Sequence, residues 1–343
     1  MKWGAALGTL AGLALAAWLL ASYGLADILG LLRRAGWGLL AVVLFHGVQL
    51  LFSALAWQAV AWQTLAAGAG AGAARAQPGL GEYVALRWIR EGVNNLLPVA
   101  QIGGEVVAVR LLRRRGVPLT AAVAGSVGDL TMEMLTQVLF TLAGLGLLVL
   151  LVGESGVGGY LLGGVALAAA AAAGFVAAQW FGLAGLVERG LVRLSARFGW
   201  APLGEVGGLD AALRALYRSP RRLAWAFTHH SASWALGGLE VCLALHLLGT
   251  DVGFGEGLVI EALGQALKAA GFAIPGALGV AEGGYVVVCH LFGLAPELAL
   301  ALGLAKRLRE VALGVPALVA WQVLEGRPSP GGGTAATTRG AST

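Results

Sequence analysis

The chain has 343 residues, of which 58% are hydrophobic and only 12% are charged, with a net charge of +5 and a mean hydropathy of +0.80. An ordinary soluble domain has about 25% charged residues, so this chain lacks the polar side chains that would cover a soluble fold of its size. Its two cysteines, Cys242 and Cys289, exclude a disulfide scaffold and a cysteine zinc site. We therefore expect an all-helical integral membrane protein with several spans.

Six apolar stretches are long enough to cross a membrane, which takes about 20 apolar residues. The first follows Lys2 and is similar to a signal peptide, but its length and the spans after it favour a membrane anchor. The six stretches are 4–22, 38–62, 119–151, 158–181, 222–248 and 299–323. Residues 326–343 are rich in Gly, Pro, Ser and Thr, which predicts a disordered tail.

Two further apolar stretches, 81–109 and 253–297, are interrupted by polar residues and by proline. Pro98 lies inside the first, and Pro275 lies at the corresponding place in the second. Because proline removes a backbone donor and clashes with the preceding turn, we expect each helix to break there. Each stretch is predicted to form a re-entrant hairpin, which enters the membrane and returns to the same side. Irregular backbone is tolerated at that depth only where protein or a cavity surrounds it.

The positions of the basic residues favour hairpins over full spans. With a cytoplasmic N-terminus and two hairpins, 15 of the 23 Lys and Arg residues fall on the cytoplasmic side, including the expected loop RLLRRRG at 110–116. If 81–109 crossed the membrane, this cluster would lie outside, against the positive-inside rule. Arg33 and Arg34 do fall outside, where the amphipathic stretch DILGLLRRAGW is expected to lie in the outer interface. Both termini are predicted to be cytoplasmic.

Two more amphipathic stretches are expected between the fourth and fifth spans. The first has an arginine at every fourth residue between 189 and 197, and the second, 206–218, has leucines at helical spacing. Both are expected to lie on anionic phospholipid headgroups at the cytoplasmic surface.

The two halves of the chain match at an offset near 177 residues. Pro98 is followed seven residues later by Glu105, as Pro275 is by Glu282. Residues 1–151 and 152–325 then each contain two spans, a hairpin and a third span. Because three crossings is an odd number, the second repeat must be inverted relative to the first. Paired interrupted segments in matching positions are typical of a transporter site; the alternative is chance similarity between two broken helices.

Charged residues inside the predicted spans are functional candidates, because each costs at least about 2.5–3.5 kcal/mol at the centre of a membrane helix. Asp129 and Glu133 share one helix face, and the repeat register places Asp129 opposite Arg307. We expect a carboxylate–guanidinium contact within about 4 Å between 119–151 and either 299–323 or a hairpin arm. Such a network can hold the halves together, bind the phosphate of a lipid, or do both.

The predicted substrate-binding residues are the charged and amide side chains of both hairpins and of the third span in each half: Arg87, Arg90, Glu91, Asn94, Asn95, Gln101, Glu105, Asp129, Glu133, Lys268, Glu282, Lys306, Arg307, Arg309 and Glu310. The planar guanidinium group suits a phosphodiester. The alternative is that the arginines of the first hairpin pair locally with Glu91 or Glu105. The amide side chains near the turn are expected to satisfy backbone groups that Pro98 leaves without partners.

Four segments of the chain look familiar: VNNLLPVAQIGGEVVAVRLLRRRGVPLTAAV, GDLTMEMLTQ, GFAIPGALGVAEGGY and LAKRLRE. They resemble the flippase-like transmembrane region of the lysylphosphatidylglycerol synthase superfamily. Within that superfamily they are most similar to the hopanoid-biosynthesis-associated membrane proteins. The resemblance covers most of residues 1–325. It implies a multi-pass protein of the bacterial inner membrane that handles or moves polar lipids. The synthases also have a soluble domain that transfers lysine from aminoacyl-tRNA. This chain ends about 20 residues after its last span, so we expect no such transfer by it alone.

Three functions stay open at this point. The first is a lipid translocase, and the second is a membrane enzyme that modifies a lipid headgroup, with Glu105, Asp129 or Glu133 as general base. The third is a non-transporting assembly partner of lipid-biosynthesis enzymes. The sequence contains no nucleotide-binding motif and no HxxxH spacing, so we expect no cofactor, no metal site and no nucleic-acid partner.

Overall fold

The computed structural model describes residues 2–68, 78–97, 103–152, 209–271 and 274–326, and all regular structure within these ranges is helical. Long helices occupy five of the six predicted spans: α1 (Lys2–Ser22), α3 (Leu39–Gly68), α6 (Leu119–Val152), α10 (Pro220–Leu247) and α13 (Pro296–Gly326). The predicted span 158–181 and the predicted tail after residue 326 lie outside the described residues. The expected all-helical fold is confirmed for the described ranges.

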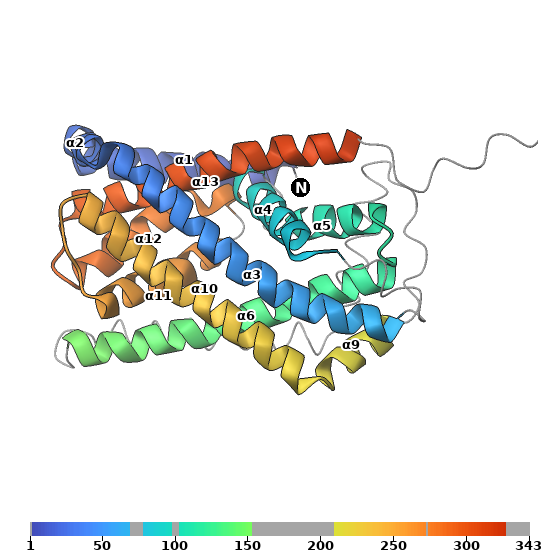
Figure 1. Cartoon of the computed structure of the whole chain (residues 1–343). Coiled ribbons are helices and arrows are strands. Elements are labelled where there is room, and N and C mark those ends of the chain that lie inside the picture. Colours follow the sequence, from blue (N-terminus) through green and yellow to red (C-terminus); the bar gives the residue numbers. More distant parts are fainter. Residues whose placement is uncertain (1, 69–77, 98–102, 153–208, 272–273, 327–343) are drawn as a thin grey trace, which may run out of the picture.

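Two pairs of shorter helices stand where the sequence predicts hairpins. The first pair is α4 (Leu80–Leu96) and α5 (Gly103–Arg114). The second pair is α11 (Phe254–Ala270) and α12 (Val280–His290), with the short 3-10 helix η3 (Pro275–Ala277) between them. In the view of Figure 1, α4 and α5 lie to the right of α11 and α12.

Both pairs are broken at the positions where proline was expected to interrupt the helix. Leu97, which precedes Pro98, has an extended backbone with φ −105° and ψ 147°, as a residue before proline prefers; Pro98 itself lies outside the described residues. In the second pair η3 begins at Pro275, and Gly276 adopts a positive φ of 62°, which glycine does at little cost. The two breaks meet, since a Cβ atom on Gly276 would lie 3.4 Å from the carbonyl oxygen of Asn95 at the end of α4.

The basic cluster at 110–115 belongs to a helix and not to a loop. α5 continues through Arg114, so the expected loop over 110–116 is wrong for most of its length. The reason is that carboxylates hold these arginines in place. Arg110 pairs with Glu325 at the end of α13, and Arg115 pairs with Glu82 in the first turn of α4.

Two short amphipathic helices lie beside the long ones. α2 (Leu25–Ala35) and the 3-10 helix η1 (Gly36–Gly38) cover the predicted stretch DILGLLRRAGW. α9 (Leu209–Tyr217) forms within 206–218, but Leu209, Leu213 and Leu216 are buried against α3 and α6. The expectation that this helix rests on lipid headgroups is therefore wrong for its apolar face, because protein covers that face. The arginines between 189 and 197 lie outside the described residues.

The long helices pack around the two broken pairs. α3 and α10 lie side by side along much of their length (Figure 1). Ser233 of α10 donates a hydrogen bond to the carbonyl of Gln49 of α3 at 3.1 Å. α4 packs against α13, and in the matching way α11 packs against α6. Each broken pair is thus held against a long helix from the other half of the chain.

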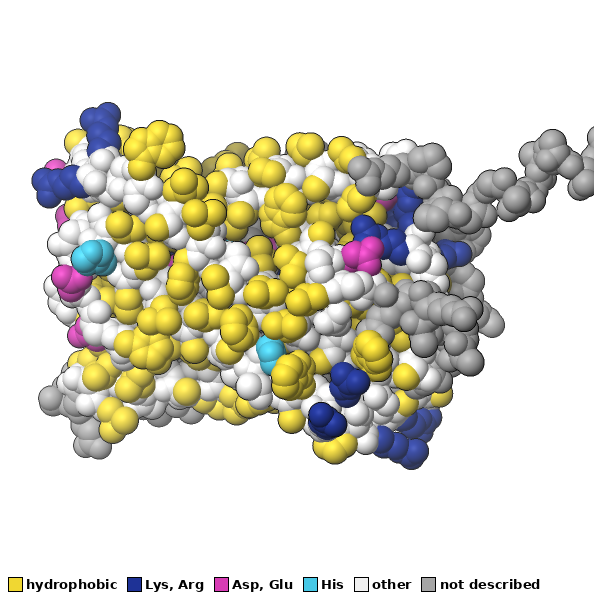
Figure 2. Space-filling model, viewed as in Figure 1, with side chains coloured by type: hydrophobic (Ala, Val, Ile, Leu, Met, Phe, Trp, Pro, Cys, Tyr) yellow, Lys and Arg dark blue, Asp and Glu magenta, His cyan; other side chains and the backbone are white. Residues whose placement is uncertain are grey.

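The outside of the bundle is apolar. Hydrophobic side chains cover the middle of the face in Figure 2, and Lys and Arg side chains gather toward its ends. Trp37, Leu44 and Leu150 are 92%, 67% and 82% exposed. Among the described residues, the helical stretches Leu25–Ala66 and Leu119–Val152 are long and apolar enough to cross a membrane. An apolar surface of this extent is that of a protein surrounded by lipid.

The close approach of α4 and α13 gives the first prediction. A Cβ atom on Gly92 would lie 2.7 Å from the Cβ of Ala317 and 3.2 Å from the backbone of Gly314, so Gly92→Ala must push the helices apart. We expect a loss of about 1–3 kcal/mol of stability, measured as a lower melting temperature of the purified protein in detergent. Gly47→Ala is the matched control, since that helical glycine has nothing within 4 Å and alanine favours the helix. A melting temperature of Gly92→Ala equal to that of the wild type would contradict this packing.

Candidate functional site

Arg90 of α4 lies at the centre of a cluster of charged side chains inside the bundle. Its Nη1 donates to Oδ2 of Asp129 at 2.5 Å and its Nη2 to Oε2 of Glu133 at 2.7 Å, both on α6. Its Nε donates to Oε1 of Glu105 on α5 at 2.8 Å. The Arg90 side chain is only 4% exposed, and Asp129 is fully buried. One guanidinium group therefore joins α4, α5 and α6.

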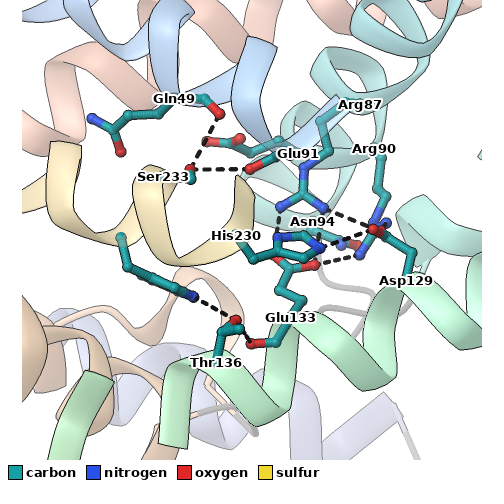
Figure 3. Close-up of polar contacts among 12 residues, drawn as sticks. Gln49, Arg87, Arg90, Glu91, Asn94, Asp129, Glu133, Thr136, His230 and Ser233 are labelled. Carbon is teal, nitrogen blue, oxygen red and sulfur yellow. Dashed lines mark hydrogen bonds and ion pairs between the residues drawn. The ribbon is translucent and has the colours of Figure 1, made fainter. Parts of the chain in front are cut away.

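Arg87 and His230 complete this first cluster, in which the side chains point toward one another (Figure 3). Arg87 lies one turn before Arg90 on α4; its Nη1 donates to Glu133 at 2.9 Å, and its Nη2 also contacts that carboxylate. His230 of α10 lies with its Nε2 at 3.0 Å from Oδ1 of Asp129. The first cluster consists of Arg87, Arg90, Glu105, Asp129, Glu133 and His230.

A second cluster surrounds the basic residues of α13. Lys306 donates to Glu261 of α11 at 2.5 Å, and Arg309 pairs with Glu240 of α10. Arg307 donates to Glu282 of α12 at 2.8 Å, and Lys268 of α11 donates to Glu310 at 2.6 Å. Arg307 also donates to Glu310 at 2.8 Å. The second cluster consists of Glu240, Glu261, Lys268, Glu282, Lys306, Arg307, Arg309 and Glu310.

His46 of α3 connects the second cluster to α4. Its Nδ1 lies 3.1 Å from Oε2 of Glu240, and its Nε2 lies 2.7 Å from Oε1 of Glu91. Glu91 is next to Arg90 in the sequence and belongs to the helix that supplies the first cluster. Gln49, one turn after His46, donates to the same oxygen of Glu240 at 2.6 Å.

The amide side chain of Asn94 ties the ends of the first broken pair together. Its Oδ1 accepts the backbone N–H of Gly104 at 2.8 Å, and its Nδ2 lies 3.3 Å from both oxygens of Glu105. The expected role of an amide near Pro98, satisfying backbone groups at the break, is confirmed for this residue. Gln101 lies outside the described residues.

The expected contact between a carboxylate of 119–151 and an arginine of a hairpin arm is confirmed by Arg90 and Asp129. The expected opposition of Asp129 and Arg307 is wrong, because Arg307 binds Glu282 and Glu310. The reason is that the charges of each third span pair with the broken helices of the same half: Asp129 of α6 with Arg90 of α4, and Arg307 of α13 with Glu282 of α12. The local alternative is confirmed for Arg90 with Glu105, whereas Glu91 binds His46.

Sequence reasoning missed three members of this network: His46, His230 and Glu240. All three are buried within long apolar helices, at 7%, 1% and 0% exposure. The histidines were set aside because they lack metal-ligand spacing, and among the described residues no cluster that could hold a metal ion is found. A single ionisable residue in an apolar span was the signal that could have identified each of them.

A small crevice lies beside this network, between α3, α4 and α13. The crevice is narrow, with a cavity volume of about 10 Å³, which is room for about one water molecule, and it is partly open to the outside. Its lining contains both polar and apolar side chains, and α4 and α13 come close together beside it at Gly92 and Gly314. Its lining residues are Leu50, Trp88, Glu91, Gly92, Asn95, Arg309, Glu310, Leu313 and Gly314.

Three guanidinium N–H groups in the network have no hydrogen-bond partner within the described part of the chain. They are Nε of Arg87, Nη2 of Arg307 and Nε of Arg309, all buried. A buried donor without a partner costs about 1–3 kcal/mol, and Arg309 lines the crevice. The network can therefore donate further hydrogen bonds to an acceptor that enters there.

Asp129→Asn tests the first cluster. The substitution removes the charge that balances Arg90 and places an N–H group against either Arg90 or His230, so we expect a loss of about 3–5 kcal/mol, seen as a large drop in melting temperature. Asp251→Asn is the matched control, because Asp251 is 87% exposed and pairs only with exposed His246 among the described residues. An equal response of the two variants would show that the buried pair contributes nothing.

Adding Arg90→Gln to Asp129→Asn is not expected to restore stability. Arg90 also binds Glu105 and Glu133, and its removal leaves both carboxylates with fewer donors. Full recovery in the double variant would mean that Arg90 and Asp129 act as an isolated pair.

Comparison with known proteins adds one finding. Residues 5–317 match the model of a family described as the lysylphosphatidylglycerol synthase TM region. No curated protein and no solved structure matches the chain.

Proposed function

Because the chain belongs to the family of lysylphosphatidylglycerol synthase transmembrane regions, and is a membrane protein, we propose that it moves a polar lipid between the leaflets of a membrane. The observation that supports this proposal most directly is the crevice, whose lining contains both polar and apolar side chains. Glu91, Asn95 and Arg309 supply the polar groups, and Leu50 and Leu313 supply apolar surface. A polar lipid has the same two parts, a headgroup that needs hydrogen bonds and chains that need apolar surface.

The free donors of the network indicate the kind of headgroup. Arg309 lines the crevice with one N–H group lacking a partner among the described residues. A phosphate group accepts such bonds from guanidinium, with a gain roughly twice that of a neutral hydrogen bond. The remaining predicted substrate-binding residues of the two clusters then act by holding Arg309 and the ends of the broken helices in position.

We extend the proposal to the topology, in which residues 1–151 and 152–325 form inverted repeats with one re-entrant hairpin each. Supporting this, α4 and α11 begin alike, with GLGE and GFGE, and each glycine N–H donates to the glutamate three residues later, at 2.9 and 2.7 Å. The helix contacts also match, since α4 meets α13 as α11 meets α6. The basic end with Arg110 and Arg115 is then cytoplasmic, in a bacterial inner membrane with both termini on that side.

Cysteine labelling tests this topology. Single cysteines at exposed Gly81 and Gly116, which flank the first broken pair, should be labelled by an impermeant maleimide from the same, cytoplasmic side. Cysteines at Asp251 and Ala295, which flank the second, should both be labelled only from the opposite side. Labelling of Gly81→Cys and Gly116→Cys from opposite sides would mean that α4 and α5 together cross the membrane.

The single-cysteine variants are made from a parent protein in which both native cysteines have been replaced. Cys289 is buried and Cys242 is half-buried, so replacing both by alanine removes unwanted labelling with little change at the surface. Because Gly116 has a φ of 87°, its variant is accepted only if it elutes as the parent does in size-exclusion chromatography.

Lipid movement is tested with the purified protein in phosphatidylcholine–phosphatidylglycerol vesicles that contain a trace of fluorescent phosphatidylglycerol. We expect dithionite to quench label from both leaflets when the protein is present. Leu313→Trp, which fills the crevice, should slow the exchange by about tenfold or more, a barrier increase near 1.4 kcal/mol. Val319→Trp on the same helix is the control, since Val319 is 59% exposed and faces away from the protein.

The same experiment separates the other functions. New lipid masses in the vesicles would support an enzyme acting on the headgroup, and neither exchange nor product would favour an assembly partner of lipid-modifying enzymes. The resemblance to hopanoid-associated proteins makes a hopanoid or an aminoacyl-phospholipid the expected cargo. Mass spectrometry of lipids that co-purify with the wild type, and that Leu313→Trp loses, identifies which.

A further inference from the structure

Both ring nitrogens of His46 face carboxylate oxygens. Nε2 lies 2.7 Å from Glu91, and Nδ1 lies 3.1 Å from Glu240. A neutral imidazole has one N–H donor and one lone pair, so in that state one of the two contacts would set a lone pair against an oxygen. Both contacts are favourable when both nitrogens are protonated. We propose that His46 is an imidazolium held between Glu91 and Glu240, and that this proton-binding site couples lipid movement to protons.

The groups around His46 differ between its two ring nitrogens, and the contact with Glu91 depends on the Nε2 proton. On the α10 side, Glu240 accepts from Gln49 of α3 and pairs with Arg309 of α13, and Lys306 lies at 3.7 Å. Glu240 therefore keeps several donors whatever the state of His46. On the α4 side, within the described part of the chain, His46 is the only hydrogen-bond partner of the Glu91 side chain. Loss of the Nε2 proton thus removes the hydrogen bond between His46 of α3 and Glu91 of α4.

The accessibility of the three side chains gives the route of that proton. Glu91 lines the crevice with 28% of its side chain exposed, compared with 9% for His46 and none for Glu240. A proton from the outside therefore reaches Nε2 through the Glu91 carboxylate, and it leaves by the same path. The crevice that we assign to the lipid headgroup is also the entrance for the proton, so each can affect the binding of the other.

The charge of the whole network favours a proton on His46. Glu91 and the two clusters contain eight carboxylates and six Lys or Arg side chains, and an imidazolium at His46 reduces this excess of negative charge. The carboxylates are Glu91, Glu105, Asp129, Glu133, Glu240, Glu261, Glu282 and Glu310, and the cations are Arg87, Arg90, Lys268, Lys306, Arg307 and Arg309. A buried network with less net charge bears less of the cost of an unpaired ion.

The proton site is tested on the wild-type protein in nanodiscs by ¹⁵N NMR of labelled histidine, which needs no transport. The chain has five histidines, and His46→Gln assigns the signal. We expect two N–H protons on His46 near neutral pH, and one in Glu91→Gln, where an uncharged amide replaces the carboxylate. If His46→Gln does not fold, glutamine substitutions of His229, His230, His246 and His290 assign the other four signals and leave that of His46 by elimination. A single N–H on His46 throughout about pH 5 to 9 would overturn the proposal.

The coupling rests on the proposed function and is tested in the fluorescent-lipid vesicles described above. The exchange rate of the wild type should change with pH, by up to about tenfold per pH unit, the limit for one bound proton. His46→Gln should keep exchange but lose this pH dependence. Glu91→Gln also changes the lining of the crevice, so its exchange should be slower, and what remains should not vary with pH. The control His229→Gln, at a half-buried position on α10 outside the network, should retain it.

The two proposals fail in different ways. No exchange at any pH would overturn the transport function, while the NMR result would still decide whether His46 binds a proton. Exchange that does not vary with pH in the wild type would overturn the coupling and leave the transport function intact.

Discussion

The fold depends on the guanidinium group of Arg90 and the three carboxylates that it holds. Glu105, Asp129 and Glu133 come from two helices, and none of these charges can lie unpaired in an apolar surrounding without a cost of several kcal/mol. The hydrophobic effect cannot select this arrangement, because lipid is as apolar as the helix surfaces it would replace. The ion pairs fix which side of α4 faces α6, and they thereby fix how the first broken pair sits in the bundle.

Close packing of small residues supplies the second constraint. Gly104 lies so close to the backbone of Arg90 that a side chain there would collide with it. Gly92 likewise lets α4 and α13 approach closely because it has no side chain. Without a solvent-driven force between helices, attraction depends on short distances over many atoms. Glycine at these positions lets the charged side chains reach their partners across the bundle. Packing and charge thus specify the same register of α4.

The sequence predicts the elements of this structure better than their pairings. Apolar length identifies the long helices, and Pro98 and Pro275 identify the breaks, because these are local properties of the chain. Which cation meets which carboxylate depends on tertiary contacts. The repeat register places Arg307 opposite Asp129, yet Asp129 pairs with Arg90 of α4 and Arg307 pairs with Glu282 of α12. His46 was missed because its partners, Glu91 and Glu240, are 45 and 194 residues away.

The ion pairs of the two clusters can form at different stages of protein synthesis, because their partners are separated differently along the chain. The arginines of the first cluster precede their carboxylates by 15 to 46 residues, so these pairs can form as soon as α6 has been synthesised. In the second cluster two buried carboxylates come before their cations: Glu240 precedes Arg309 by 69 residues, and Glu261 precedes Lys306 by 45. Until the ribosome has released α13, these carboxylates lack their Lys and Arg partners, and placing them in the bilayer is unfavourable in free energy. The second half must therefore wait for its last helix before it can settle in the membrane.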